Sequence, residues 1–328
     1  MPLKLFLAGL SAVCITAASV GSASSAEDLN IYFKSYPATE LLRPFADPAD
    51  FKLLVTGADG RPIDRGTIAI RLEAPPRAVF STDYPLVEQT LLNEMELPLT
   101  GGSAQWKQLL PIRGDYRLST AVSTGTQKVN KDFNFHVREN RQKWLSLGLF
   151  SVVLFLLGFI AGRVFTGTSA TGFFICGFFN VLLAVTAPVR AENSAGLEVD
   201  EAIVGQPSEI RWHLTNGDGA STDSARLTLR ITHLEKNKTV FAIERISTGA
   251  AWTMRFHFPD AGAYRIDTIA RIAEGPALTN EQLVQVAAVE PPLSASIPAI
   301  GYFIALIAAG LGVGRWSKRA ALGSLRAS

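Results

Sequence analysis

The sequence predicts a mainly β protein anchored by transmembrane α-helices. Long apolar runs without acidic residues occupy residues 144–162, 168–189 and 292–314. Short segments rich in β-branched and apolar residues, separated by turns that contain Gly and Pro, fill residues 27–143 and 190–291. Their spacing is typical of immunoglobulin-like or cupredoxin-like sandwiches. We therefore expect two β-sandwiches, a transmembrane helical hairpin between them and a C-terminal transmembrane helix.

The composition argues against several functional classes. The 328 residues include 31 Lys and Arg against 29 Asp and Glu, and a net charge of +2 gives no reason to expect a nucleic-acid partner. The 2 cysteines, Cys14 and Cys176, both lie in apolar runs, so neither sandwich contains a disulfide or a Cys-based metal site. The sequence contains no GxSxG, HExxH or P-loop motif. We expect no catalytic residues, and hence a protein that is not an enzyme.

Residues 1–26 have the three parts of a secretory signal peptide. Lys4 supplies the positive charge, Leu5–Val20 is apolar, and Ser24-Ser25-Ala26 offers small residues before a cut at Glu27. An uncleaved anchor is the alternative. The signal places the first sandwich, residues 27–143, outside the cytoplasm.

The stretch 144–189 predicts the helical hairpin. Its only charged residue is Arg163, in the short connection between two runs that are each about 20 residues long, enough to cross a hydrocarbon core of roughly 30 Å. A hairpin returns the chain to its starting side, so the second sandwich, residues 190–291, lies beside the first. The alternative is a signal-peptidase site ending at Ala191, which would make the two halves separately processed proteins.

The third run, residues 292–314, is followed by a basic tail at residues 315–328, which contains no acidic residue. Basic segments stay in the cytoplasm, so this tail agrees with an inner-membrane protein whose two large domains are periplasmic. The basic residues Arg138, Arg141 and Lys143, which precede the first span on the outer side, are the one feature that opposes this orientation.

The two halves share a local pattern. Trp106 is followed by a Pro-to-Gly turn and then by Tyr116-Arg-Leu, and Trp252 is followed by a similar turn and then by Tyr264-Arg-Ile. A tyrosine at this point is typical of the corner tyrosine of immunoglobulin-like sandwiches. Duplication of one sandwich explains the pattern; a chance likeness of hairpins is the alternative. The expected strands are 51–56, 66–72, 90–97, 104–109, 116–122 and 131–137, then 209–215, 225–234, 239–246, 251–258, 263–272 and 282–289.

Small residues in the spans predict close helix contacts. Gly158 and Gly162 form a GxxxG motif, and Gly310 and Gly314 repeat the spacing. The partner is either another membrane subunit or this chain's own helices. No Asp, Glu, His or Lys lies inside a span, so the helices are expected to be anchors rather than an ion path.

Two histidines carry the only metal hypothesis. Alternation along their strands predicts that His213 and His257 face outward, and pairing of the two strands would make the imidazoles neighbours. Two imidazoles can begin a copper or zinc site. The alternative is two solvated surface histidines, and no other cofactor is expected.

Residues 252–266, with the pattern Trp-x-x-x-Phe-x-Phe-Pro-Asp-Ala-Gly-x-Tyr-Arg-Ile, resemble the extracytoplasmic sandwiches of the YtkA-like and FixH-like families. That resemblance implies a membrane-tethered bacterial domain linked to metal handling or oxidase assembly. The order of signal, sandwich, hairpin and sandwich is also similar to the B subunit of copper membrane monooxygenases. The His-x-His and N-terminal His of that family have no counterpart here, so its copper ligands do not carry over.

These observations favour a membrane-anchored periplasmic accessory or scaffold protein. Its expected partners are the bilayer and other membrane or periplasmic proteins. The alternatives are a periplasmic copper-handling protein and a non-catalytic subunit of a membrane enzyme.

Overall fold

A computed structural model describes residues 29–80, 82–125, 127–165, 196–214, 225–272 and 277–326. The predicted signal peptide at 1–26, the second predicted span at 168–189 and the alternative processing site at Ala191 lie outside these residues.

The described residues form seven strands in each half of the protein. The first half contains six expected strands, although β4 begins one residue later than predicted and β7 three residues earlier, and it adds β1, which the sequence did not reveal. The second half likewise adds β8. The strands of the first half are β1 (Asn30–Tyr36), β2 (Ala49–Thr56), β3 (Thr67–Glu73), β4 (Leu91–Pro98), β5 (Ser103–Gln108), β6 (Gly114–Ser123) and β7 (Lys128–Val137), with one 3-10 turn at Thr39–Leu41. The strands of the second half are β8 (Leu197–Val199), β9 (Pro207–His213), β10 (Ala225–His233), β11 (Lys238–Thr248), β12 (Ala251–His257), β13 (Gly262–Ile272) and β14 (Ala277–Val286).

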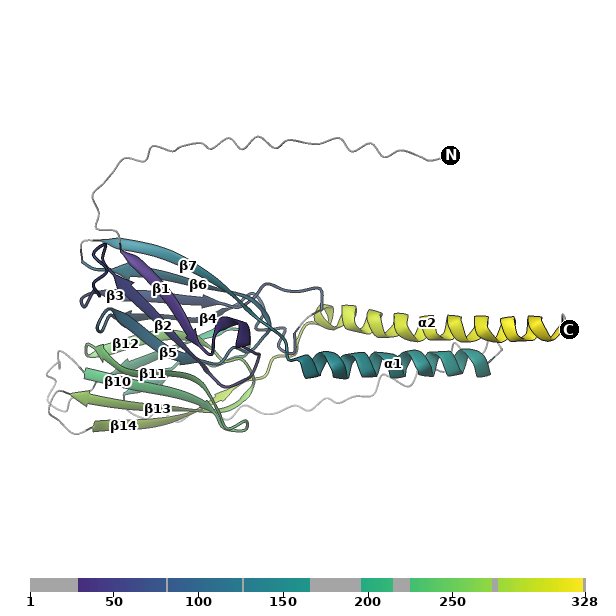
Figure 1. The fold of residues 1–328 in the computed structure, drawn as a ribbon. Coiled ribbons are helices and arrows are strands. Elements are labelled where there is room, and N and C mark those ends of the chain that lie inside the picture. The colour runs from purple at the N-terminus through teal and green to yellow at the C-terminus, as the bar shows by residue number, and fades with distance from the viewer. Residues whose placement is uncertain are drawn as a thin grey trace, which may run out of the picture.

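The two halves form one continuous structure instead of two separate sandwiches. One seven-stranded sheet has the order β1-β2-β5-β11-β10-β13-β14, and the facing seven-stranded sheet has the order β7-β6-β3-β4-β12-β9-β8. Antiparallel pairing of β5 with β11 and of β4 with β12 joins the halves, as in the pair Met95–Met254 (Figure 1). The two sandwiches expected from the sequence are therefore joined through both of their sheets. Backbone groups at the edges of each half find partners in the other half, which removes four exposed sheet edges.

The joined halves have the same topology. In each half the first, second and fifth strands form one layer, and the third, fourth, sixth and seventh form the other. At both joins the fourth strand of one half pairs with the fifth strand of the other. This exchange is the pattern of a two-fold symmetric dimer made within one chain. It favours duplication, and Trp106 and Trp252 occupy equivalent fifth strands.

Both corner tyrosines are present. The Tyr116 hydroxyl donates to the carbonyl of Ile112 at 2.6 Å and accepts from the Ile112 amide at 3.1 Å. The Tyr264 hydroxyl donates to the carbonyl of Asp260 at 3.0 Å. Both side chains are fully buried, and burial raises the pKa of each phenol above its ordinary value. Each hydroxyl thus ties a strand to the preceding turn, as the sequence pattern predicted.

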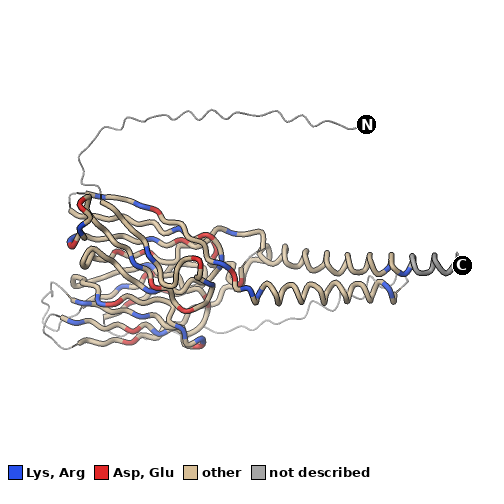
Figure 2. Tube along the Cα trace, in the orientation of Figure 1, with Lys and Arg blue, Asp and Glu red and all other residues tan. Residues whose placement is uncertain are grey.

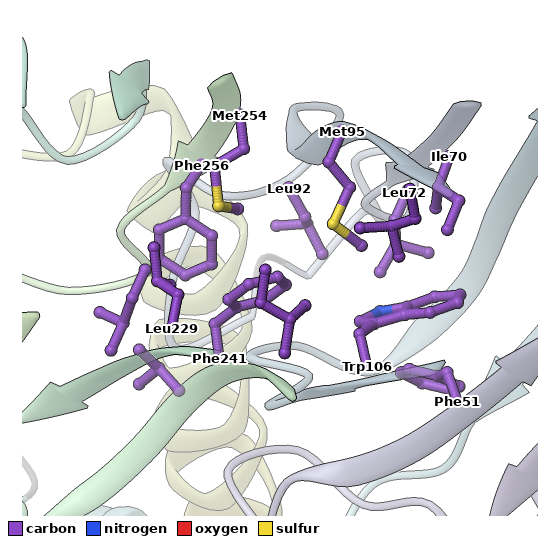
Figure 3. Close-up of a cluster of buried hydrophobic side chains, with 14 of the residues drawn as sticks. Phe51, Ile70, Leu72, Leu92, Met95, Trp106, Leu229, Phe241, Met254 and Phe256 are labelled. Atoms are coloured by element: carbon purple, nitrogen blue, oxygen red, sulfur yellow. The ribbon is translucent and has the colours of Figure 1, made fainter. Parts of the chain in front are cut away.

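One hydrophobic core runs through both halves. Trp106 and Phe241 lie in one sheet and face Met95, Met254 and Phe256 in the other (Figure 3). The Phe241 and Phe256 rings meet at a centroid distance of 5.5 Å across the two sheets. Because these side chains belong to the joining strands, the seam between the halves is as well buried as the centre of either half.

Two long helices leave the same end of the sandwich and run side by side (Figure 1). They are α1 (Arg141–Val164), which begins after the N-cap Asn140, and α2 (Leu293–Arg326). The side chain of Asn140 accepts from the Gln142 amide at 3.0 Å. Figure 2 shows Lys and Arg at both ends of α1 and near the far end of α2, with uncharged residues along the rest of each helix.

Both helices are long and apolar enough to cross a membrane, with mean hydropathies of 2.4 for residues 141–164 and 2.0 for residues 293–318. Only 28% and 11% of their most apolar windows are buried, which distinguishes them from core helices of a globular domain.

Candidate functional site

His213 and His257 do not come together. Their strands pair as expected, but the antiparallel register places His213 opposite Ala251 and His257 opposite Pro207. The two histidines therefore lie at opposite ends of the pair, separated by roughly 20 Å of strand. The predicted two-histidine metal site is therefore not formed. The prediction failed because the alternation of side chains along a strand does not show which residues of the paired strands lie opposite each other.

The expected outward orientation of His257 is also wrong. Its side chain is 2% exposed, and within the described structure neither ring nitrogen has a hydrogen-bond partner. Burial lowers the pKa of His257 to about 4, so the imidazole is neutral at physiological pH. At this end of the β9–β12 pair, the loop before β4 packs against the residues before β9, where Leu86 lies beside Gly205.

The remaining histidines are also apart from each other. His233 is 1% exposed, and the centre of its ring lies 4.5 Å from that of Tyr264. His136 is exposed on β7, and its Nδ1 lies 2.7 Å from Oδ1 of Asp115. Across the described ranges, no three His, Cys, Asp or Glu side chains gather in the manner of a metal site.

The four glycines singled out in the spans lie between α1 and α2. A Cβ atom on Gly158 would overlap the carbonyl oxygen of Ile307, and one on Gly162 would overlap that of Leu311. Gly310 and Gly314 meet the carbonyl oxygens of Phe155 and Phe159 in the same way. The two motifs therefore interlock in a parallel helix pair, and the partner of each motif is this chain itself.

The junction between sandwich and helices holds the densest group of polar contacts near the predicted membrane. We call the membrane-side junction the set formed by the described residues 75–80 and 82–90 of the loop before β4, Arg113 and the start of α1. The Arg113 guanidinium lies 3.7 Å from the Glu139 carboxylate, 5.2 Å from the centre of the Trp144 ring and 3.4 Å from the carbonyl oxygen of Phe80. One cation thus holds the loop, the end of β7 and the first turn of α1 together.

A second set of contacts fixes the loop to the helices. Lys143 at the start of α1 pairs with Asp83, and with Glu139 at 3.8 Å. The Phe80 ring meets the Tyr302 ring of α2 edge-on at 5.9 Å, and the Tyr302 hydroxyl lies 3.3 Å from Ser151 of α1. The loop therefore contacts both helices beyond the point where they leave the sandwich.

An open cavity of about 510 Å³ lies at this junction, lined by side chains that include Arg77, Glu88 and Trp144. Glu88 is 3% exposed; its Oε1 accepts from the Thr82 amide at 2.6 Å, whereas no donor in the described structure reaches Oε2. Gly114 borders the cavity with φ of 122°, and a side chain there would overlap Pro75.

Sequence reasoning did not single out this loop. It is a 17-residue connection between β3 and β4, with a Pro-Pro pair and the adjacent apolar residues Val79 and Phe80. The length of the connection and these two exposed apolar residues were the available signals, since long loops within compact domains are uncommon and often functional.

No known protein family matches the sequence, and no curated protein matches it. Similar solved structures include the D0–D1 domain of intimin, at 9% identity and a TM-score of 0.23, covering 77% of this chain and 97% of that chain. The structure of invasin, a bacterial integrin-binding protein, matches at 9% identity and a TM-score of 0.23, covering 80% of this chain and 40% of that chain. A CARDB domain from Pyrococcus furiosus, in complex with di-metal ions, matches at 12% identity and a TM-score of 0.23, covering 38% of this chain and 100% of that chain. None of these similarities bears on function.

The coordinates themselves define the class of protein. It is a mainly β protein with two facing antiparallel sheets and immunoglobulin-like strand order, and its described residues include two attached helices that could span a membrane.

Proposed function

We propose that this protein is a membrane-anchored, non-enzymatic scaffold that holds a double β-sandwich at the outer surface of a bacterial inner membrane. The observation that carries the proposal is the arrangement of the helices. Two parallel helices with interlocked glycines leave one end of a sandwich whose halves share both sheets. Such a unit presents a large surface at a fixed height above the bilayer.

The free edge of β14 favours a role in protein interaction. This strand ends one sheet, and its side chains Leu278 and Leu283 are 44% and 58% exposed. An edge strand of ten residues offers backbone groups to a partner strand and apolar side chains to a partner surface. The partner is a periplasmic or membrane protein, and a membrane enzyme served by this chain as a non-catalytic subunit is one form of the same proposal.

Cysteine accessibility tests the membrane arrangement. In a background with Cys14→Ala and Cys176→Ala, Asp59→Cys lies on the turn after β2, at the end of the sandwich opposite the helices, and Arg326→Cys lies at the end of α2. In intact cells with a permeabilised outer membrane, a membrane-impermeant maleimide is expected to label position 59 and to reach position 326 only after lysis. Labelling of position 326 in intact cells would overturn the proposed orientation.

Site-specific photo-crosslinking tests the interaction. A photoreactive amino acid at Leu283, on the exposed edge, is expected to give a discrete adduct in native membranes. The same group at Asp59, far from that edge, serves as the control. Equal adduct patterns at both positions, or none at Leu283, would contradict a scaffold that uses the β14 edge.

A further inference from the structure

The membrane-side junction exposes apolar side chains where the sandwich meets the helices. Val79 is 79% exposed and Phe80 is 46% exposed, at the tip of the loop after β3. Nearby on the helices, Trp144 is 54% exposed and Leu293 is 82% exposed. In Figure 1 the loop extends beyond the sandwich alongside the beginning of α2.

The contact between Phe80 and Tyr302 fixes the height of this loop relative to the helices. The helical rise is about 18 Å from Ser151, which contacts Tyr302, to Arg163, and about 20 Å from Tyr302 to Arg315. Both arginines mark the far, charged ends of the apolar runs (Figure 2). With a hydrocarbon core of roughly 30 Å, Tyr302 lies about 10 Å inside the outer boundary. Side chains on a helix tilt toward its N-terminus, so Phe80 meets Tyr302 from the side of that boundary.

Several backbone groups of the loop need no hydrogen bond from water. Pro75 and Pro76 have no N–H group to satisfy, and the carbonyl of Phe80 accepts from Arg113 at 3.4 Å. Beyond the tip, the Thr82 amide donates to the buried Glu88 carboxylate at 2.6 Å. The loop therefore places two apolar side chains at its tip without exposing these backbone groups.

Charges around the loop match a lipid headgroup layer. Arg77, Arg138 and Arg141 are exposed and form no ion pair with any described residue. Lys143 is paired with Asp83. Three free guanidinium groups beside an apolar tip can bind phosphates while the tip enters the acyl region. This also accounts for the basic residues before the first span, which otherwise oppose the predicted orientation.

We propose that Val79 and Phe80 form a lipid-inserting tip that enters the outer leaflet beside α2, with Arg77, Arg138 and Arg141 at the phosphates. This inference rests on the proposed membrane anchoring. The tip gives the sandwich a point of attachment to the bilayer in addition to the membrane-spanning helices, and so fixes its tilt.

Fluorescence quenching in nanodiscs tests the proposal. The full chain, with both native cysteines replaced by alanine, carries Val79→Cys labelled with the environment-sensitive dye NBD, in nanodiscs of phosphatidylcholine and phosphatidylglycerol. We expect a shift of NBD emission to shorter wavelength, quenching by lipids with a spin label near the top of the acyl chain, and protection from aqueous iodide. The additional change Phe80→Ser, which removes the contact with Tyr302, is expected to weaken the lipid quenching while the unfolding midpoint is retained.

Two control positions separate this proposal from the membrane anchoring on which it rests. NBD at Asp59→Cys, at the far end of the sandwich, is expected to respond to iodide and not to lipid quenchers. NBD at Val153→Cys, on α1, is expected to respond to deeper spin labels. Lipid quenching at position 153 without quenching at position 79 overturns the inserting tip alone. Loss of lipid quenching at both positions overturns the anchoring as well.

Discussion

Asn93 and Gln108 form a buried hydrogen bond between the two sheets at the point where the two halves meet. Asn93 lies on β4 beside Phe256 of β12, and Gln108 lies on β5 beside Phe241 of β11. The Asn93 amide donates from Nδ2 to Oε1 of Gln108, and the two side chains are 0% and 2% exposed. This polar pair therefore spans the core at both joins simultaneously. Its directionality favours one register where apolar contacts alone would allow several.

We predict that removing one partner of this pair destabilises the protein more, per substitution, than replacing both partners with apolar residues. Asn93→Leu or Gln108→Leu alone leaves a buried amide without its partner, and each is expected to lower the free energy of unfolding by about 1–3 kcal/mol. The double substitution Asn93→Leu/Gln108→Leu is expected to cost less than the sum of the single changes. Urea unfolding of the full chain in detergent, analysed as a double-mutant cycle, measures the coupling. Additive losses would contradict a direct interaction.

Because both sheets are continuous, the two halves should unfold together. Met254→Ala removes a side chain that is 1% exposed at the seam, and it is expected to cost about 2–5 kcal/mol. In hydrogen exchange with mass spectrometry along a urea series, Met254→Ala is expected to lower the urea concentration at which peptides exchange by the same amount for β3 and for β10. Leu283→Ser, at an exposed position, is expected to leave both urea concentrations unchanged. A shift confined to the second half would mean that the halves are independent units.

The buried His257 predicts a loss of stability in mild acid. Burial lowers the pKa of this imidazole from 6.5 to about 4 in the folded protein, so the unfolded chain binds the proton more readily. The contribution of His257 is fully present above pH 6.5 and decreases as the pH falls from 6.5 toward 4, by at most about 1.4 kcal/mol per pH unit. His257→Phe should flatten this part of the stability profile, whereas His213→Gln at the other end of the strand pair should not. Thermal or urea unfolding across this pH range measures how stability depends on pH in each variant. If stability falls as steeply with pH in His257→Phe as in the unaltered protein, the prediction is contradicted.

The two corner tyrosines should differ in their contributions. Tyr116→Phe removes two hydrogen bonds to Ile112, whereas Tyr264→Phe removes one to Asp260. A hydrogen bond of this kind contributes about 0.5–1.5 kcal/mol, so the first change is expected to be roughly twice as costly as the second. Urea unfolding of the two variants measures the loss of unfolding free energy in each. A larger loss for Tyr264→Phe would show that the number of hydroxyl hydrogen bonds does not determine which tyrosine contributes more.

Close contact of α1 and α2 predicts a position-dependent response to small substitutions. Gly158→Ala introduces a methyl group where the Ile307 carbonyl already lies, so the helices must separate, at an expected cost of about 1–3 kcal/mol. Gly148→Ala on the same helix meets no described atom within 4 Å and is the matched control. Unfolding in mixed detergent micelles, followed by circular dichroism, measures both variants. Equal stability of the two would contradict the interlocked glycines.

The local patterns in the sequence determined most elements and both helices. Ile68, Ile70 and Leu72 alternate with exposed residues and lie on the buried face of β3, because period-two alternation matches the pleat of a half-buried strand. The spacing of Trp and Tyr in each half likewise predicted the two tyrosine corners. The strand β8 spans only three residues, too few to show an alternating pattern. The edge strand β1 was missed although Ile31, Tyr32 and Phe33 favour a strand.

Tertiary structure alone decided how the halves meet and what surrounds each histidine. Pairing of β4 with β12 and of β5 with β11 uses backbone N–H and C=O groups, which every residue of a strand offers, so no side-chain pattern specifies it. The burial of His257 depends on register and on neighbouring segments, which alternation along one strand does not encode. The approach of Phe80 to Tyr302 joins residues more than 200 positions apart, and only the folded chain brings them together.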